Sequence, residues 1–166
     1  VWECEHGDWS VYSVHVCGGY LYTGCGDGKG RNIDISTGEV VRLYGGWEEH
    51  GFRVYEVHAD GDHLYAACVS DGEDEDMRYS ARKIDTRTGE VVWECEHGGD
   101  VKCVHVDGDH LYTGCDDGMA RKIDVETGQV VHGHKHEAPV HSVHVDGGYL
   151  YTGTGHPDNK ARRMLL

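Results

Sequence analysis

The stretch that decides the fold is Val104-His-Val-Asp-Gly-Asp-His-Leu-Tyr-Thr-Gly114, which is followed by Arg121-Lys-Ile-Asp124 and Thr127-Gly-Gln-Val-Val131. β-Branched and aromatic residues form short runs, and Gly and Asp stand between them, as is typical of short strands joined by tight turns. An Asp-Gly pair between two such runs is the strongest short hairpin signal. No segment shows helical periodicity. We therefore predict four short antiparallel strands in this unit.

The same unit occurs four times along the 166 residues. Its first motif begins at Val14, Val57, Val104 and Val143. A four-stranded unit that repeats about every 40 residues is the signature of a β-propeller blade. We predict a single all-β domain over residues 1–166, a β-propeller of four four-stranded blades. The predicted blades cover residues 8–44, 51–97, 98–136 and 137–166, the last one completed by a strand at 1–7.

The chain begins and ends at different points of the repeat. Val1-Trp-Glu-Cys-Glu-His-Gly7 repeats Val92-Trp-Glu-Cys-Glu-His-Gly98, so the chain begins with a fourth strand. It ends on Arg162-Arg-Met-Leu165, which corresponds to a third strand. Residues 1–7 can complete the last blade of the same chain in a four-bladed monomer. They can also complete the last blade of a second chain, and we expect this eight-bladed homodimer because twofold rings are the commonest assemblies.

The repeat resembles the WD-repeat family along the whole chain. The residues that carry the resemblance are a His before each first strand, the Leu-Tyr-Thr-Gly strand and the Asp residues that follow it, namely His6, His50, His97, His136, Asp27, Asp117, Asp34, Asp85 and Asp124. In that family a His, a Ser or Thr, an Asp and a Trp form a hydrogen-bonded network in each blade. The resemblance implies that His50 or His97, Thr23 or Thr113, and Asp27 or Asp117 belong to such a network.

One position departs from the WD-repeat pattern, because Ile33, Ile84, Ile123 and Met164 replace the Trp. The implied network is therefore incomplete. A weaker likeness is carried by Thr88-Gly-Glu-Val-Val-Trp93, which is similar to quinone-type propeller repeats.

Charge and cysteine usage narrow the class of protein. Fifteen Lys and Arg against 30 Asp and Glu give a net charge of −15, which argues against binding to nucleic acid or an anionic membrane through bulk electrostatics. The seven Cys include no Cys-x-x-Cys pair, and no apolar run is long enough to span a membrane. We expect an intracellular protein, cytoplasmic or nuclear, without structural disulfides. Cys25, Cys68 and Cys115 are equivalent positions and are predicted to be small buried residues.

Two insertions interrupt the repeat around the second blade. One lies between the second and third strands of this blade, at 69–79, and the other precedes its first strand, around 45–50. Because an up-and-down blade places both on one face, we expect them to meet. The predicted binding residues are Trp47, Glu48, Glu49, Phe52, Glu73, Asp74, Glu75, Asp76 and Tyr79. Aromatic side chains within an acidic rim suit a basic peptide.

The sequence contains no catalytic motif, and we predict a non-enzymatic scaffold that binds a protein or a basic peptide and needs no cofactor. Two alternatives remain open. The chain is a repeat fragment or an engineered self-assembling propeller with no dedicated ligand, or it is a metal- or quinone-dependent propeller enzyme. For a metal, the candidate ligands recur once per blade on the innermost strand, at His15, His58, His105 and His144. The more ordinary role for these four side chains is packing between blades.

Overall fold

The computed structural model of the chain describes residues 1–45, 52–70 and 78–166. These residues form fifteen strands and no helix. The strands are β1 (Val11–Cys17), β2 (Tyr20–Cys25), β3 (Gly30–Asp34), β4 (Val40–Tyr44), β5 (Phe52–Ala59), β6 (His63–Ser70), β7 (Tyr79–Asp85), β8 (Val91–Glu96), β9 (Val101–Asp107), β10 (His110–Cys115), β11 (Met119–Asp124), β12 (Val130–Lys135), β13 (Val140–Asp146), β14 (Tyr149–Thr154) and β15 (Ala161–Leu165). The described residues contain no helix that is long and apolar enough to cross a membrane.

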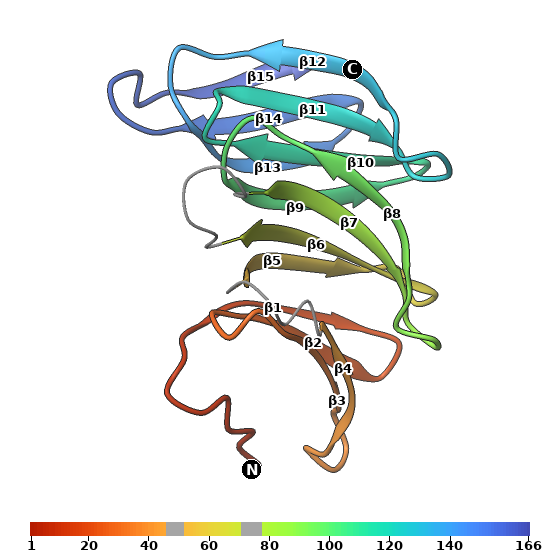
Figure 1. The fold of residues 1–166 in the computed structure, drawn as a ribbon. Coiled ribbons are helices and arrows are strands. Elements are labelled where there is room, and N and C mark those ends of the chain that lie inside the picture. The colour runs from red at the N-terminus through yellow and green to blue at the C-terminus, as the bar shows by residue number, and fades with distance from the viewer. Residues whose placement is uncertain (46–51, 71–77) are drawn as a thin grey trace.

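The strands form four antiparallel sheets in chain order, which we call blades 1 to 4: β1–β4, β5–β8, β9–β12 and β13–β15. Each strand pairs with its neighbour in sequence, so every blade is an up-and-down meander. The blades stack one on the next along an open arc, with the two ends of the chain at opposite ends of the stack (Figure 1). The predicted all-β propeller architecture is confirmed.

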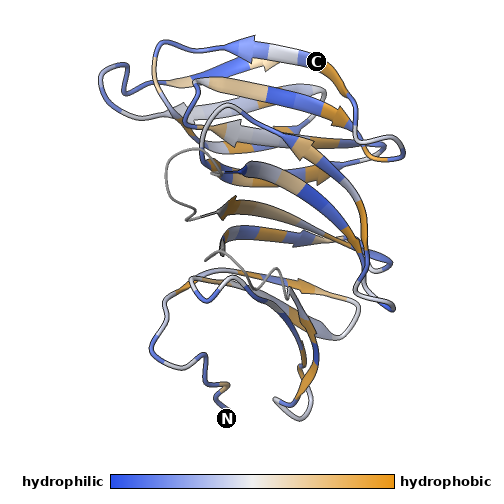
Figure 2. Cartoon of the chain, in the orientation of Figure 1, coloured by the Kyte–Doolittle hydropathy of each residue, from blue (hydrophilic) through white to orange (hydrophobic). Residues whose placement is uncertain are grey.

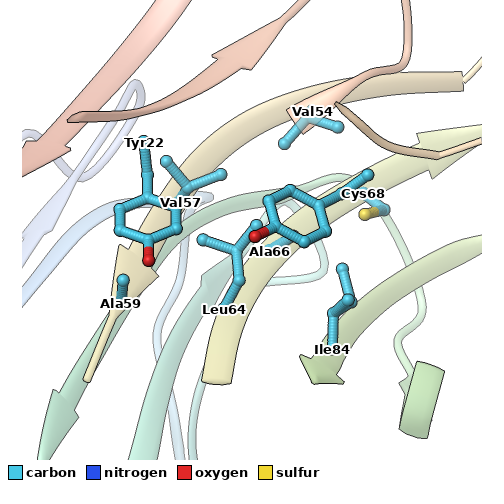
Figure 3. Packing of buried hydrophobic residues seen from close by; sticks show 9 residues of the cluster. Tyr22, Val54, Val57, Ala59, Leu64, Ala66, Cys68 and Ile84 are labelled. Atoms are coloured by element: carbon cyan, nitrogen blue, oxygen red, sulfur yellow. The ribbon is translucent and has the colours of Figure 1, made fainter. Parts of the chain in front are cut away.

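Apolar side chains between consecutive blades hold the stack together. Figure 2 shows that hydrophobic and hydrophilic residues are interspersed along the strands, as expected when each blade presents one face to each neighbour. Between blades 1 and 2, Tyr22 belongs to a buried cluster with Val57, Leu64 and Ile84, and its ring lies beside Val57 and Leu64 (Figure 3). The same pattern recurs between blades 2 and 3 around Tyr65 and between blades 3 and 4 around Tyr112.

The three positions of Cys25, Cys68 and Cys115 are fully buried, as predicted. All seven cysteines are free thiols. Burial raises the pKa of the Cys68 thiol to about 12, so this group stays protonated and behaves as a small apolar side chain.

The last blade differs from the expectation, because it contains three strands instead of four. Residues 1–7 do not pair with β15 and lie instead against blade 1. Trp2 Nε1 donates a hydrogen bond to the carbonyl oxygen of Ile35 at 2.8 Å, and His6 Nε2 is hydrogen-bonded to Thr23 Oγ1 at 2.9 Å. These contacts favour blade 1 because its turn and second strand provide the acceptor and the hydroxyl group.

The insertion in blade 2 also differs from a plain loop. In blade 3 the hairpin of β10 and β11 ends at the pair Gly114 and Ala120, whereas in blade 2 the pairing continues to Val69 and Tyr79. Part of the inserted sequence therefore lengthens β6 and β7. Tyr79, predicted as a loop residue, is the first residue of β7 and is half-buried.

Candidate binding face

One end of every blade contains the hairpin between the second and third strands and the start of the first strand. We call this end of the stack the entry face. Both insertions leave from it, because Phe52 at the start of β5 pairs with Ser70 at the end of β6, and Tyr79 pairs with Val69. The strand ends that flank the two insertions are therefore neighbours, as the strand order predicted. Trp47, Glu48, Glu49, Glu73, Asp74, Glu75 and Asp76 lie outside the described residues.

Four β-bulges near the entry face form a second feature. In each blade the register of the first strand shifts at one residue, which leaves that residue unpaired: Tyr12, Tyr55, Lys102 and His141. A bulge turns a side chain away from the regular alternation of the strand and is common beside binding sites. We call these four residues the bulge row.

The first three members of the bulge row touch one another. The rings of Tyr12 and Tyr55 lie 5.3 Å apart between centroids. The Lys102 ammonium group lies 4.5 Å from the centroid of the Tyr55 ring, which is within cation–π distance. Trp9 lies beside them and is more than half exposed, and both it and Tyr12 would be within 3.4 Å of a Cβ atom placed on Gly26.

Carboxylates surround the ammonium group of Lys102. Its Nζ lies 2.7 Å from Asp100 and 3.2 Å from Asp116. Burial lowers the pKa of Lys102, but the hydrogen bonds with the two carboxylates outweigh this effect and leave the pKa above its ordinary value. Next to this group is a cavity of about 400 Å³, lined among others by Asp116, Lys135 and Glu137. The entry face thus offers exposed aromatic rings beside grouped carboxylates.

The four inner-strand histidines form a row across the blades. The ring centroids of His15 and His58 are 4.2 Å apart, those of His58 and His105 5.4 Å, and those of His105 and His144 4.5 Å. Burial, helped by the neighbouring rings of His15 and His105, lowers the pKa of His58 to about 4. Within the three described ranges, no three or more His, Cys, Asp or Glu side chains are placed to hold a metal ion. The row is an inter-blade packing feature in this geometry.

The network implied by the WD-repeat resemblance is formed only in part. His97 Nδ1 donates to the carbonyl oxygen of Cys95, so its Nε2 accepts the hydroxyl proton of Thr113 at 2.9 Å. In blade 1 the matching histidine is His6, and His50 lies outside the described residues. Neither Asp joins the histidine.

The two aspartates of the implied network pair with arginine instead. Asp27 binds Arg31 and Asp117 binds Arg121, each through two hydrogen bonds. Burial alone would raise the pKa of Asp117, but the Arg121 guanidinium holds it well below its usual range. The arginine four residues after each aspartate supplies a charged donor with two N–H groups, whereas Nδ1 of His97 donates to the carbonyl oxygen of Cys95. The carboxylate therefore pairs with the arginine.

The bulge row was missed at the level of sequence. Its members stand at one repeat position, directly before Ser13-Val, Glu56-Val, Cys103-Val and Ser142-Val, and their identities vary inside an otherwise regular frame. The variation at this one repeat position was the sequence signal that could have pointed to the bulge row. The bulge itself is a matter of strand pairing and has no residue signature here.

Comparison with known proteins supports the architecture. A family model, PQQ_2, described as outer membrane protein assembly factor BamB, matches residues 6–133 and 79–163. No curated protein matches the chain. Among solved structures, the computationally designed Ika4 protein is similar with a TM-score of 0.80 and 17% identity, over 99% of this chain and 96% of that one.

Two longer chains are also similar. The designed Ika8 protein matches with a TM-score of 0.76 at 17% identity over 95% of this chain, and a chain of the mitotic checkpoint complex with 0.74 at 21% over 92%. In both cases the match covers 46% of the longer chain, so the present chain spans about half of their length. These likenesses show the fold alone.

Proposed function

The chain belongs to the propeller-repeat family described by the model of outer membrane protein assembly factor BamB, and from this premise we propose that it is a non-enzymatic scaffold that binds a basic peptide or protein segment on its entry face. The proposal covers the bulge row and the acidic insertions of blade 2.

The observation that carries the proposal is the environment of Lys102. Its ammonium group lies over the Tyr55 ring and contacts Asp100 and Asp116. The entry face thereby holds one cation of its own between an aromatic ring and carboxylates. A lysine or arginine from a partner needs the same surroundings, and the adjacent Tyr12 ring is 45% exposed.

Net charge and the insertions support a cationic partner. The chain has a net charge of −15, which attracts basic segments and raises their association rate. Glu48, Glu49 and the run Glu73–Asp76 belong to segments whose flanking strand ends are paired on the entry face. Contacts with aromatic side chains contribute to the affinity, and carboxylates raise the association rate of a cationic partner.

The test uses a fluorescein-labelled hexa-arginine peptide and measures fluorescence anisotropy at low and high salt. We expect the unmodified chain to bind it and not a labelled hexaglutamate peptide. Replacement of Glu73, Asp74, Glu75 and Asp76 by Ser is expected to weaken binding about tenfold at low salt and less at high salt, because salt screens exposed charges. Tyr12→Ala is expected to weaken binding at both salt concentrations, because it removes an aromatic contact.

The matched control removes the same four charges on the opposite face. Asp62, Asp107, Asp109 and Asp146 are exposed residues at or beside the turns between first and second strands. Their replacement by Ser changes net charge equally and leaves the entry face intact. If the two four-residue variants lose affinity for hexa-arginine to the same extent, the attraction comes from the net charge and not from the entry face. The proposed site is then wrong. Failure of the unmodified chain to bind hexa-arginine would overturn the proposal altogether.

Two finer points belong to the same proposal. The WD-repeat likeness is supported by the His97–Thr113 hydrogen bond, and the aspartate–arginine pairs depart from it. An intracellular, reducing location agrees with seven free thiols, most of them buried.

A further inference from the structure

The inner strand of blade 1 exposes a residue whose equivalents in the other three blades are buried. Val14 is 63% exposed, whereas the equivalent residues are at most 8% exposed: Val57, Val104 and Val143. Val16 is exposed to the same extent as Val14. In blades 2 to 4 these positions are covered by the preceding blade. Blade 1 therefore carries an uncovered apolar face shaped to receive one more blade before it.

Blade 4 carries the complementary face at the other end of the arc. Tyr151 is 37% exposed, whereas the equivalent residues are at most 2% exposed: Tyr22, Tyr65 and Tyr112. Those three tyrosines pack against the next blade, whereas no blade of the described residues covers Tyr151. A cavity of about 430 Å³ lies at this face, lined among others by Ser142, Tyr151 and Gly153.

Gly153 shows what the cavity would receive. A Cβ atom placed on Gly114 would lie 2.9 Å from the carbonyl oxygen of Val140, because the next blade packs directly on this glycine. The same distance separates a Cβ on Gly24 from the oxygen of Val54. On Gly153 a Cβ would meet only Ser142 of its own blade, at 3.6 Å. The residue equivalent to Val54 and Val140 in blade 1 is Val11, which is exposed.

Hydrogen bonds across the first two junctions give the register. The backbone N–H of Val57 donates to Ser13 Oγ of the preceding blade at 3.0 Å, and that of Val104 donates to Glu56 Oε2 at 2.7 Å. Ser142 is the equivalent acceptor on blade 4 and is exposed. The equivalent donor on blade 1 is the N–H of Val14.

The segment at 1–7 stands where the outer strand of a preceding blade would stand. Trp2 donates to the carbonyl oxygen of Ile35 as Trp93, in the outer strand of blade 2, donates to that of Val125 in blade 3. His6 binds Thr23 as His97 binds Thr113. The segment therefore occupies the place of the fourth strand of a preceding blade. The first three strands of that blade must come from elsewhere. Among the described residues, blade 4 has three strands, and no strand pairs with the outer edge of β15.

We propose that two copies of this chain close one ring of eight blades, in which blade 1 of each copy docks on blade 4 of the other and residues 1–7 of each complete the other's last sheet. A second copy is the occupant because its face has the required Val11, Val14, Trp2 and His6, and because twofold symmetry fills both junctions at once. The open arc in Figure 1 and the match to about half of two longer propeller chains agree with half a ring.

The first measurement is the mass of the 166-residue chain by light scattering coupled to size exclusion. We expect about 37 kDa, which is twice the 18.4 kDa of one chain. A mass near 18 kDa at every concentration overturns the proposal, and so does an open-ended series of larger species. Neither of these mass results tests whether the entry face binds a basic peptide. One proposal can therefore fail while the other holds.

Two variants locate the junction from both sides. Val14→Lys places a charge at an exposed site of the single chain, so folding is expected to be unaffected, but in the ring the charge is buried without a partner. Gly153→Leu fits the open cavity of the single chain and fills the space that Val11 needs. Each variant is expected to weaken dimerisation by about 100-fold or more.

The control is Val131→Lys, which adds the same charge at an outer-strand position. Val131 is exposed, and so are its equivalents Val41 and Val92, so blade packing does not cover this position. We expect Val131→Lys to remain dimeric with an unchanged circular dichroism spectrum. A dimer that survives both Val14→Lys and Gly153→Leu uses another surface and contradicts the proposed ring.

Discussion

Thr113 and Thr152 are equivalent residues whose hydrogen bonds differ. Thr113 Oγ1 is bonded to His97, whereas Thr152 Oγ1 and His136 Nε2 are buried without a hydrogen-bond partner in the described part of the chain. The shape of valine matches threonine, so a change to valine removes the hydroxyl and little else. Comparison of the two threonines therefore measures how much the hydrogen bond between Thr113 and His97 contributes to the free energy of unfolding.

We predict that Thr113→Val lowers the free energy of unfolding by about 1–2 kcal/mol, because it leaves the half-buried His97 ring without its hydrogen donor. Thr152→Val is the matched control and is expected to be neutral or slightly stabilising. Urea denaturation followed by circular dichroism measures both. Equal losses in the two variants would mean that the hydroxyl–histidine bond adds no stability.

At the scale of elements, the inner strands β1, β5, β9 and β13 each contribute one histidine to the row. Burial lowers the pKa of His58 to about 4, and the pKa of His105 is lowered for the same reason. The unfolded chain has ordinary histidines with a pKa near 6.5. Below pH 6.5 the unfolded state therefore binds more protons than the folded state, and stability falls as the pH decreases towards 4.

We predict that the urea midpoint of the unmodified chain drops between pH 7 and pH 5. His58→Gln is expected to reduce this drop, because glutamine does not titrate and the row then loses its most buried proton acceptor. His132→Gln, at an exposed position of β12, serves as the control and is expected to keep the full drop. A pH dependence that is identical in all three chains would show that the histidine row does not govern acid stability.

At the scale of the whole molecule, residues 1–7 lie at the blade-1 end of the arc. They contact blade 1 through Trp2 and His6, and no strand of the described residues pairs with the outer edge of β15. We predict that a chain of residues 8–166 has a lower thermal midpoint and aggregates as concentration rises, because its edge strand and the surface around Ile35 are uncovered. Static light scattering over a concentration series measures this.

Trp2→Ala is the comparison for this deletion. It removes one side chain and its hydrogen bond to Ile35, but it keeps the backbone that a neighbouring strand can pair with. An intermediate effect is expected. If the deletion and the unmodified chain scatter light identically, the segment has no role in closing the stack.

The repeat itself predicted most of the fold. The Val-His-Val and Leu-Tyr-Thr-Gly runs and the Gly-containing turns are local signals, and they recur with the spacing of a blade. Strand order within each blade follows from them, because short turns can join only antiparallel neighbours. That order also placed both insertions at one end of blade 2, as the pairing of Phe52 with Ser70 and of Val69 with Tyr79 confirms.

Tertiary structure decided what the repeat left open. Residues 1–7 have the sequence of a fourth strand, but their place against blade 1 depends on where Ile35 and Thr23 lie after the blades have stacked. The bulge row depends on a shift of strand pairing, and the cation site of Lys102 depends on the distance between blades 2 and 3. Local sequence encodes turns and strands because they involve neighbouring residues, whereas contacts between blades join residues about 40 positions apart, whose geometry only the packed stack defines.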